Sequence, residues 1–428
     1  MHRRPSGASL LSQTILYFLL AFFFGCDLTP LADLAGLSSR SPGANAALVN
    51  EDGVDNNLFD AAQIVLLPDD GELTVSGSID GRDDIDIYSL GPVLAGDRVT
   101  VDISGSNGLN TVAAMFDDGK NLIDANDDRS YYAGQLDPYM SRVIRRGMAN
   151  LYVGVAVARA KYFASDAGRF DTGAYSIRII RQPHQTMVVA RPQIAYLDFA
   201  GGANVQIALQ PYEIMQPFSA GAISQRFVDQ TEAMSDRIVE LMRADFVNYN
   251  VVLVDGRKEP TPEGPITRLY FGNFNQAFLG LSDNVDTDNV VLDQKAIIYT
   301  EDYQLFESLL PTMEEVAQAI ANTGSHELGH LLGLEHADHP LDIMSTAATA
   351  RQILENDASF QQSPLDEGVF PAGLQNGPTT LGQNVGMSGL ALSRGILSDR
   401  VELSRTKAVT AWRAAYDFTI PRCGRCVH

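Results

Sequence analysis

Three histidines within eleven residues constrain this chain more than any other feature of its sequence. Residues 326 to 336 read His-Glu-Leu-Gly-His-Leu-Leu-Gly-Leu-Glu-His. His326 and His330 are four residues apart, so a helix places both rings on one face, about a turn apart. Gly333 is predicted to follow the helix in a left-handed conformation, which reverses the chain and returns His336 to the same point. The segment therefore needs a helix, a tight reversal and a convergent third ring.

A helix ending at this point is signalled independently. Thr312 and Glu315 have the spacing of a capping box, and apolar residues continue along one face after them. We expect the helix to run from about Met313 to Leu332.

Three neutral imidazoles form a metal-binding set, and zinc suits it best because imidazole is a borderline ligand. Three protein ligands leave a fourth position for water, which is the catalytic arrangement, whereas a structural site is normally closed by a fourth ligand. Glu327 adjoins His326 and is predicted to be the general base that deprotonates the bound water and passes the proton to the leaving amine.

The segment resembles the metzincin zinc endopeptidases, whose motif is His-Glu-x-x-His-x-x-Gly-x-x-His followed by a turn that contains methionine. The resemblance implies that His326, His330 and His336 bind zinc and that Glu327 is the general base. It also implies that Met344 is the methionine below the metal. The interval of eight residues from His336 to Met344 is most similar to the matrixin branch. Protein or peptide would then be the substrate of a zinc endopeptidase.

Other positions differ from the named metzincin branches. Ala337 and Asp338 follow the third histidine, and Thr346 stands where astacins and serralysins have a tyrosine. The branch therefore stays open, and no tyrosine is assumed to assist the oxyanion. Asp338 and His339 are predicted to be bystanders, because neither matches the motif.

The order of strands and helices around the motif resembles the upper half of a metzincin, which implies an α+β catalytic domain over residues 184–428 with a mixed sheet and a long active-site helix. Further helices are expected at about 349–356 and 406–415 in its lower part. By resemblance to metzincins, 296–299 is the edge strand that pairs with substrate, whereas the pattern alone fits an internal strand equally well. The expected strands are 194–199, 251–254, 267–271 and 296–299, and a long helix is expected over 223–248.

An acidic cluster precedes the last of these strands. Asp283, Asp286, Asp288 and Asp293 lie where matrixins hold calcium, but their spacing is not that of an EF-hand. Either calcium or a solvated acidic loop fits this segment.

Residues 48–183 have the two-residue period of antiparallel strands, with turns rich in Asp, Asn and Gly, and predict an all-β sandwich of seven or eight strands. Ordered segments in this region, including 83–88, 95–101, 116–119 and 173–177, resemble the bacterial pre-peptidase C-terminal domain. Its Asp-rich turns are either calcium sites or solvated turns. The expected strands are 73–79, 85–90, 98–103, 151–157 and 174–180.

The first 26 residues read as an export signal, with Arg3 and Arg4 before an apolar run of ten residues, too short to span a bilayer. Cys26 after Gly25 resembles the lipidation site of bacterial lipoproteins, although Phe24 is atypical there. Residues 27–47 are predicted to be a flexible tether. The protein is then either a lipoprotein of the bacterial cell envelope or secreted.

Two cysteines, Cys423 and Cys426, lie near the end of the sequence. One interpretation is a small disulfide. The other uses the similarity of Pro-Arg-Cys-Gly to the matrixin latency motif, in which a cysteine thiolate caps the zinc.

The net charge of −22 excludes nucleic acid as a partner, because a polyphosphate would be repelled. A membrane enters only through the predicted lipid anchor. Two functions stay open: an exported zinc endopeptidase, and a catalytically silent zinc-containing envelope protein that binds or adheres. Glu327 favours the enzyme, because a binding protein needs no proton acceptor beside its metal.

Overall fold

The computed structural model describes residues 47–106, 108–129, 135–158, 171–208, 210–275, 277–346, 348–366, 370 and 373–388. All of them belong to one compact unit that comprises residues 46–428, separate from residues 1–45. The predicted export signal, Cys26, nearly all of the tether, the helix at 406–415, Cys423 and Cys426 lie outside the described residues.

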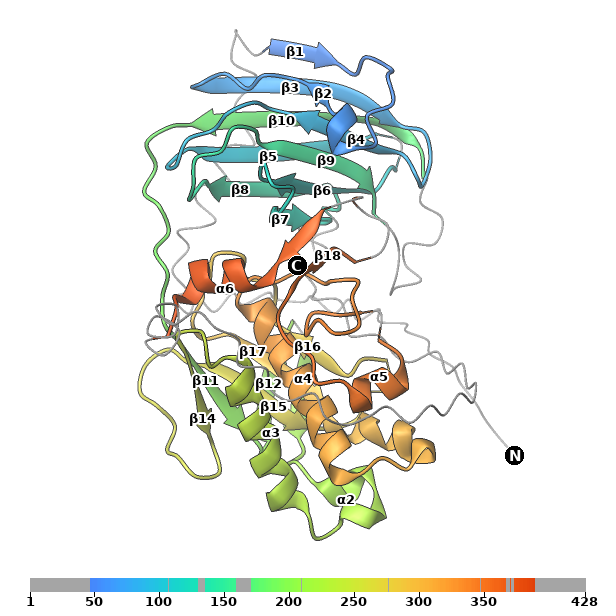
Figure 1. Cartoon of the computed structure of the whole chain (residues 1–428), viewed down its shortest axis with the longest axis vertical. Helices are drawn as coiled ribbons and strands as arrows, with labels where there is room; N and C mark the ends of the chain where they lie inside the picture. Colours follow the sequence, from blue (N-terminus) through green and yellow to red (C-terminus); the bar gives the residue numbers. More distant parts are fainter. Residues whose placement is uncertain are drawn as a thin grey trace, which may run out of the picture. The chain divides into compact units, whose positions relative to one another are not determined.

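The first part of the described chain is a β-sandwich of two five-stranded sheets (Figure 1). Buried side chains from both sheets, among them Val75, Val101, Met115 and Val153, form one core between them. The expected strands are present, and the sheets hold ten strands rather than seven or eight. In sheet order they are β1 (Ala47–Asn50), β3 (Gly71–Ile79), β10 (Gly173–Gln182), β5 (Arg98–Gly105) and β8 (Tyr139–Val143), then β2 (Gln63–Ile64), β4 (Ile85–Ser89), β9 (Tyr152–Val157), β6 (Thr111–Phe116) and β7 (Leu122–Asn126).

The second part is built on a five-stranded mixed sheet, and the four strands expected from the sequence are all in it. The strands run parallel except β16, which pairs antiparallel with β17. In order they are β14 (Val251–Asp255), β11 (Gln193–Asp198), β15 (Thr267–Gly272), β17 (Lys295–Tyr299) and β16 (Gly280–Ser282).

The edge-strand interpretation of 296–299 is wrong, because β17 is internal and β16 forms the edge. β16 has three residues, too few for a visible two-residue period, and it is held by the pairing of Leu281 with Ile297. A hairpin of β12 (Gly202–Ile207) and β13 (Gln210–Met215) packs Ile207 and Met215 against this end of the sheet.

The helix predicted over 223–248 is also wrong in its bounds. The structure has α2 (Ala220–Ile223), the 3₁₀ turn η4 (Gln225–Phe227) and then α3 (Thr231–Asp245). Ser224 has an extended backbone, with φ −155° and ψ 141°, and its hydroxyl accepts a hydrogen bond from Arg226 N–H, so the helix is interrupted there. The apolar spacing across this break had suggested one continuous helix.

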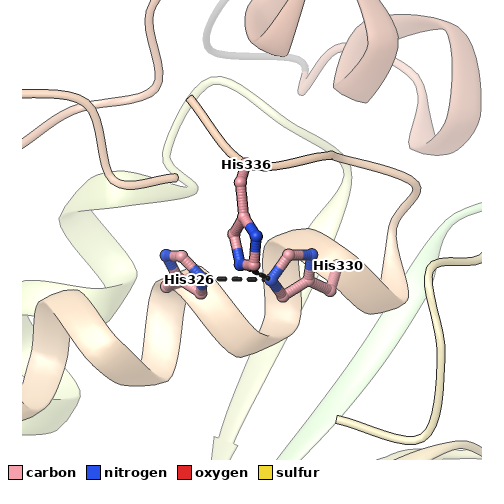
Figure 2. Close-up of side chains that lie close together, drawn as sticks. All are labelled: His326, His330 and His336. Carbon is pink, nitrogen blue, oxygen red and sulfur yellow. Dashed lines mark hydrogen bonds between the residues drawn. The ribbon is translucent and has the colours of Figure 1, made fainter. Parts of the chain in front are cut away.

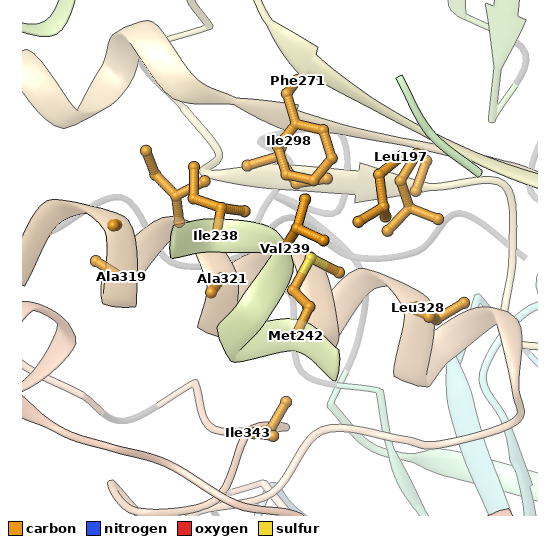
Figure 3. Packing of buried hydrophobic residues seen from close by; sticks show 14 of the residues in the cluster. Leu197, Ile238, Val239, Met242, Phe271, Ile298, Ala319, Ala321, Leu328 and Ile343 are labelled. Carbon is orange, nitrogen blue, oxygen red and sulfur yellow. The ribbon is translucent and has the colours of Figure 1, made fainter. Parts of the chain in front are cut away.

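The helix that carries His326 and His330, α4 (Met313–Leu331), has the predicted capping box and ends within one residue of the predicted position. It lies against α3, and Ile238 and Met242 of α3 fill the space beside Phe271 of β15 (Figure 3). The remaining elements are η5 (Thr300–Leu309), α5 (Ala350–Glu355), β18 (Gln362–Pro364), β19 (Leu374–Asn376), α6 (Gly377–Val385) and, in the sandwich, η1 (Phe59–Ala61). Among the described helices, none is long and apolar enough to cross a membrane.

Candidate metal centre

The structure brings the three histidines of the motif together at the end of α4 (Figure 2). The Nε2 atom of His330 lies 3.0 Å from that of His326 and 3.1 Å from that of His336. Zinc–nitrogen bonds of about 2.0–2.1 Å directed to the corners of a tetrahedron place the nitrogens about 3.3 Å apart. Two of the three nitrogen–nitrogen distances are therefore close to those of a tetrahedral zinc site, and all three ligand atoms lie within 4.8 Å of one another.

Backbone carbonyls fix the orientation of the two helical rings. His326 Nδ1 lies 2.7 Å from the Ile343 carbonyl, and His330 Nδ1 lies 2.8 Å from the Leu334 carbonyl. A carbonyl can only accept, so each Nδ1 carries the proton and each Nε2 presents its lone pair to the centre. Burial lowers the pKa of His326 to about 4, which keeps that ring neutral near pH 7.

The chain reversal after α4 is a Schellman turn. Gly333 has a φ of +93°. Its N–H donates to His330 O at 2.8 Å, and Leu334 N–H donates to Gly329 O at 3.0 Å. A Cβ at Gly333 would come within 2.8 Å of Asp286 O and Thr287 Cα, so a side chain is excluded by both backbone and packing. The reversal places His336, which is half-buried, beside the two helical histidines.

Glu327 is fully buried beside the histidines on α4. Its carboxylate lies directly against the backbone of Gly280 in β16, where an added Cβ would overlap Oε1. Gly280 was not predicted from the sequence to be near the site. A glycine within a strand is nevertheless a signal that another group approaches the backbone closely.

A pair of tyrosines, which was not predicted from the sequence, also lies near Glu327. The hydroxyls of Tyr299 at the end of β17 and Tyr212 of β13 are 2.5 Å apart. Burial raises the pKa of Tyr299 well above its usual range, and the nearby charges of Tyr212 and Glu327 act in the same direction. Tyr299 is therefore a neutral hydroxyl near the carboxylate.

Met344 is fully buried against the turn of α4 that contains Gly329 and His330. A Cβ at Gly329 would lie 2.6 Å from its sulfur, so this glycine lets the methionine approach the helix. The carbonyl of Met344 accepts from Ala337 N–H at 2.8 Å, which ties the turn to the segment carrying His336.

Asp338 and His339 lie outside the metal-binding group. Asp338 N–H donates to Pro364 O, and His339 Nδ1 accepts from Leu341 N–H at 3.3 Å. Both are engaged in local backbone structure.

Three of the four carboxylates in the acidic segment before β17 form hydrogen bonds or ion pairs with other protein groups. Asp283 accepts from the N–H groups of Ala208 and Lys295, Asp286 accepts from Val291 N–H and Gln294, and Asp288 pairs with Arg142 and Arg145. Within the described ranges, the histidines are the only group in which three or more His, Cys, Asp or Glu side chains bring ligand atoms together. Calcium, here and in the sandwich turns, stays a prediction.

No protein-family model and no curated protein matches the chain. Similar solved structures include the pre-peptidase C-terminal domain of a Bacillus anthracis collagenase, 11% identical over 32% of this chain and 98% of that domain, with a TM-score of 0.18. An archaemetzincin from Methanopyrus kandleri is 12% identical over 40% of this chain and 89% of its own, with a TM-score of 0.23. A zinc-dependent peptidase from Methanocorpusculum labreanum is 12% identical over 39% of this chain and 94% of its own, with a TM-score of 0.24. Similarities this low carry no argument, so the assignment rests on the geometry of the centre.

Proposed function

We propose that the protein is a zinc-dependent endopeptidase of the metzincin type. The observation that carries the proposal is the convergence of three imidazole Nε2 atoms, 3.0 and 3.1 Å apart, beside a buried glutamate on the same helix. Three neutral nitrogen ligands leave room for a water molecule, and the adjacent carboxylate supplies the base that such a water needs.

Zinc held by His326, His330 and His336 would acidify a bound water and polarise the scissile carbonyl. Glu327 would be the base that accepts a proton from the attacking water. The same carboxylate then delivers the proton to the leaving amine, so one residue serves both half-steps. Its burial beside Gly280 keeps bulk water away and holds the carboxylate in one position.

A peptide-library digest tests the activity. The wild type should cleave, a chelator should abolish cleavage, and Glu327→Gln should lower the rate about 10²–10⁴-fold while the zinc content stays the same. Glu314→Gln is the matched control, because Glu314 is on the first turn of the same helix and 58% exposed. Equal cleavage by the wild type, Glu327→Gln and chelated protein would leave the silent binding or adhesion lipoprotein as the better description.

We propose in addition that the protein is exported and lipidated at Cys26. The support is the sequence alone: Arg3 and Arg4, an apolar run of ten residues, and Gly25 before Cys26. Labelling cells with a palmitate analogue should mark the wild type and not Cys26→Ser. A protein that is exported without label would instead be secreted.

A further inference from the structure

The metal centre is bonded to the β-sandwich through the segment that carries its third histidine. His326 and His330 are fixed by α4 itself, but His336 follows the chain reversal and depends on packing from outside the helix. Two sets of contacts lead from this segment to the sandwich.

The first set begins at Arg145, in the loop after β8 of the sandwich. Its Nη1 donates to Asn384 Oδ1 at 2.8 Å. The amide of Asn384, which is 1% exposed, in turn donates to the carbonyls of Leu332 at 2.7 Å and Thr287 at 2.8 Å. Since Arg145 can only donate, the Asn384 side chain must turn its amide oxygen toward Arg145 of the sandwich. The NH₂ group of Asn384 then faces the end of α4. Leu332 lies between His330 and Gly333, at the start of the reversal.

Asp288 adds to this first set. Arg145 Nη2 lies 3.0 Å and Arg142 Nη1 3.3 Å from its two carboxylate oxygens. Two residues earlier, Asp286 N–H donates to the carbonyl of His330 at 3.1 Å. The arginines thereby hold the loop that packs against Gly333, and partly buried ion pairs of this kind are less screened than exposed ones.

The second set runs through the β18–β19 segment. Phe370 packs among sandwich side chains, with its ring centroid 5.4 Å from that of Phe116. Leu374 N–H donates to Lys120 O of the sandwich at 3.1 Å. The same segment binds the backbone of the third ligand, because Asp366 N–H donates to His336 O at 3.1 Å and Gln375 Nε2 donates to Glu335 O at 2.5 Å.

We propose that the β-sandwich is a positioning part of the metal centre, with Arg145 as the positioning residue that orients the end of α4 and hence His336. The inference rests on the proposed zinc site. A sandwich that acted only as a separate binding module would have no need of charged hydrogen bonds to Asn384 and Asp288, through which its arginines are connected to the turn after α4. Outer-shell partners of metal ligands typically contribute 10–100-fold to metal affinity.

The test compares the zinc dissociation constants of full-length Arg145→Gln and wild type, measured by competition with a chromophoric chelator. Arg145 acts through Asn384 and not on a ligand directly, so Arg145→Gln should bind zinc about 10-fold more weakly, at the lower end of the range for direct partners of a ligand. Arg146→Gln is the matched control: Arg146 is the next residue, its side chain is 61% exposed, and its ion pairs with Asp117 and Asp118 stay within the sandwich. This control should bind zinc like the wild type.

A second control separates positioning from stability. Arg178→Gln breaks the ion pair with Glu72 inside the first sheet, at 2.7 Å, and should lower the melting temperature without changing zinc affinity. If Arg145→Gln does not fold, Asn384→Asp replaces the NH₂ group that faces the two carbonyls and should weaken zinc binding likewise. Wild-type affinity in either folded variant would overturn the inference. A wild type that binds no zinc would instead overturn the proposed function.

Discussion

Gly280 and Glu327 meet where the edge strand passes the metal centre. The contact leaves no space for a side chain on the strand, so the smallest residue is required for the carboxylate to hold its position. Glu327 is fully buried, and its role in the proposed mechanism depends on this fixed position as well as on the basicity of its carboxylate.

Gly280→Ala should therefore reduce peptide cleavage by about 10²-fold, since a displacement of the base by roughly 1 Å has effects of that size. Zinc content should be unchanged, because Gly280 does not support the histidines. Gly81→Ala is the control, as nothing lies within 4 Å of a Cβ there. Full activity in Gly280→Ala would show that the carboxylate is not held by this contact.

A second residue-scale prediction concerns Asp86 in the sandwich. Burial raises the pKa of its carboxyl to about 8, and the nearby Glu51 and Asp84 act in the same direction, against the hydrogen bond from Tyr175. A raised folded-state pKa means that the stabilising form is the protonated one, so stability is lost as the pH rises from about 4 through about 8.

Urea unfolding between pH 5 and pH 9 checks this dependence. The wild type should lose stability with rising pH, by up to about 1.4 kcal/mol for each unit over which the pKa is raised. Asp86→Asn should make the slope shallower because its side chain does not titrate, whereas buried Asp245, whose pKa is raised to about 7, keeps a part of it. An identical slope in both proteins would assign the pH dependence to other groups.

At the scale of elements, α4 and the chain reversal that follows it hold the three histidines of the candidate metal centre. The capping box of Thr312 and Glu315 begins the helix, and the Schellman turn at Gly333 ends it so that His336 returns. The helical periodicity of α4 thus places His326 and His330 on one face, and the turn at its C-terminal end places His336 beside them.

Gly333→Ala should weaken zinc binding and destabilise the protein by more than about 1 kcal/mol, because it adds an unfavourable left-handed backbone to a clash with Asp286 and Thr287. Gly53→Ala is a matched control: Gly53 has a φ of +69° but nothing within 4 Å of the added Cβ. Gly53→Ala should lower the free energy of unfolding only by the cost of the left-handed backbone, and its zinc affinity should be that of the wild type. Equal zinc affinity in both variants would contradict the role given to the turn.

At the scale of the whole molecule, zinc binding should be coupled to the folding of the described residues, which belong to one compact unit. A ligand that binds only the folded state adds stability according to its concentration relative to its dissociation constant. The histidine centre and the sandwich are joined by hydrogen bonds and ion pairs. We therefore expect zinc binding to stabilise the sandwich as well as α4.

Zinc at 100 times its dissociation constant should stabilise the protein by about 2.7 kcal/mol, visible as a higher melting temperature in calorimetry. Glu327→Gln should keep this shift, because it retains the three histidines. His330→Gln should lose it, since the central ring of the three contributes to both short nitrogen–nitrogen distances. A zinc-induced shift that survives in His330→Gln would place the ion elsewhere.

The local sequence determined the elements and the three side chains that meet. Capping residues, the i to i+4 spacing and a glycine that tolerates positive φ act within about twenty residues, so α4, its reversal and the convergence of the histidines could be predicted. The sandwich strands followed for the same reason, because a two-residue period is a local property.

Only the tertiary structure decided what surrounds these elements. The three-residue strand β16 has no pattern of its own and forms through pairing with β17, so the edge strand and the contact of Gly280 with Glu327 could not be read from the sequence. The link from Arg145 through Asn384 to Leu332 joins residues 239 and 52 positions apart. Such contacts depend on how the folded chain packs, so local sequence propensity does not predict them.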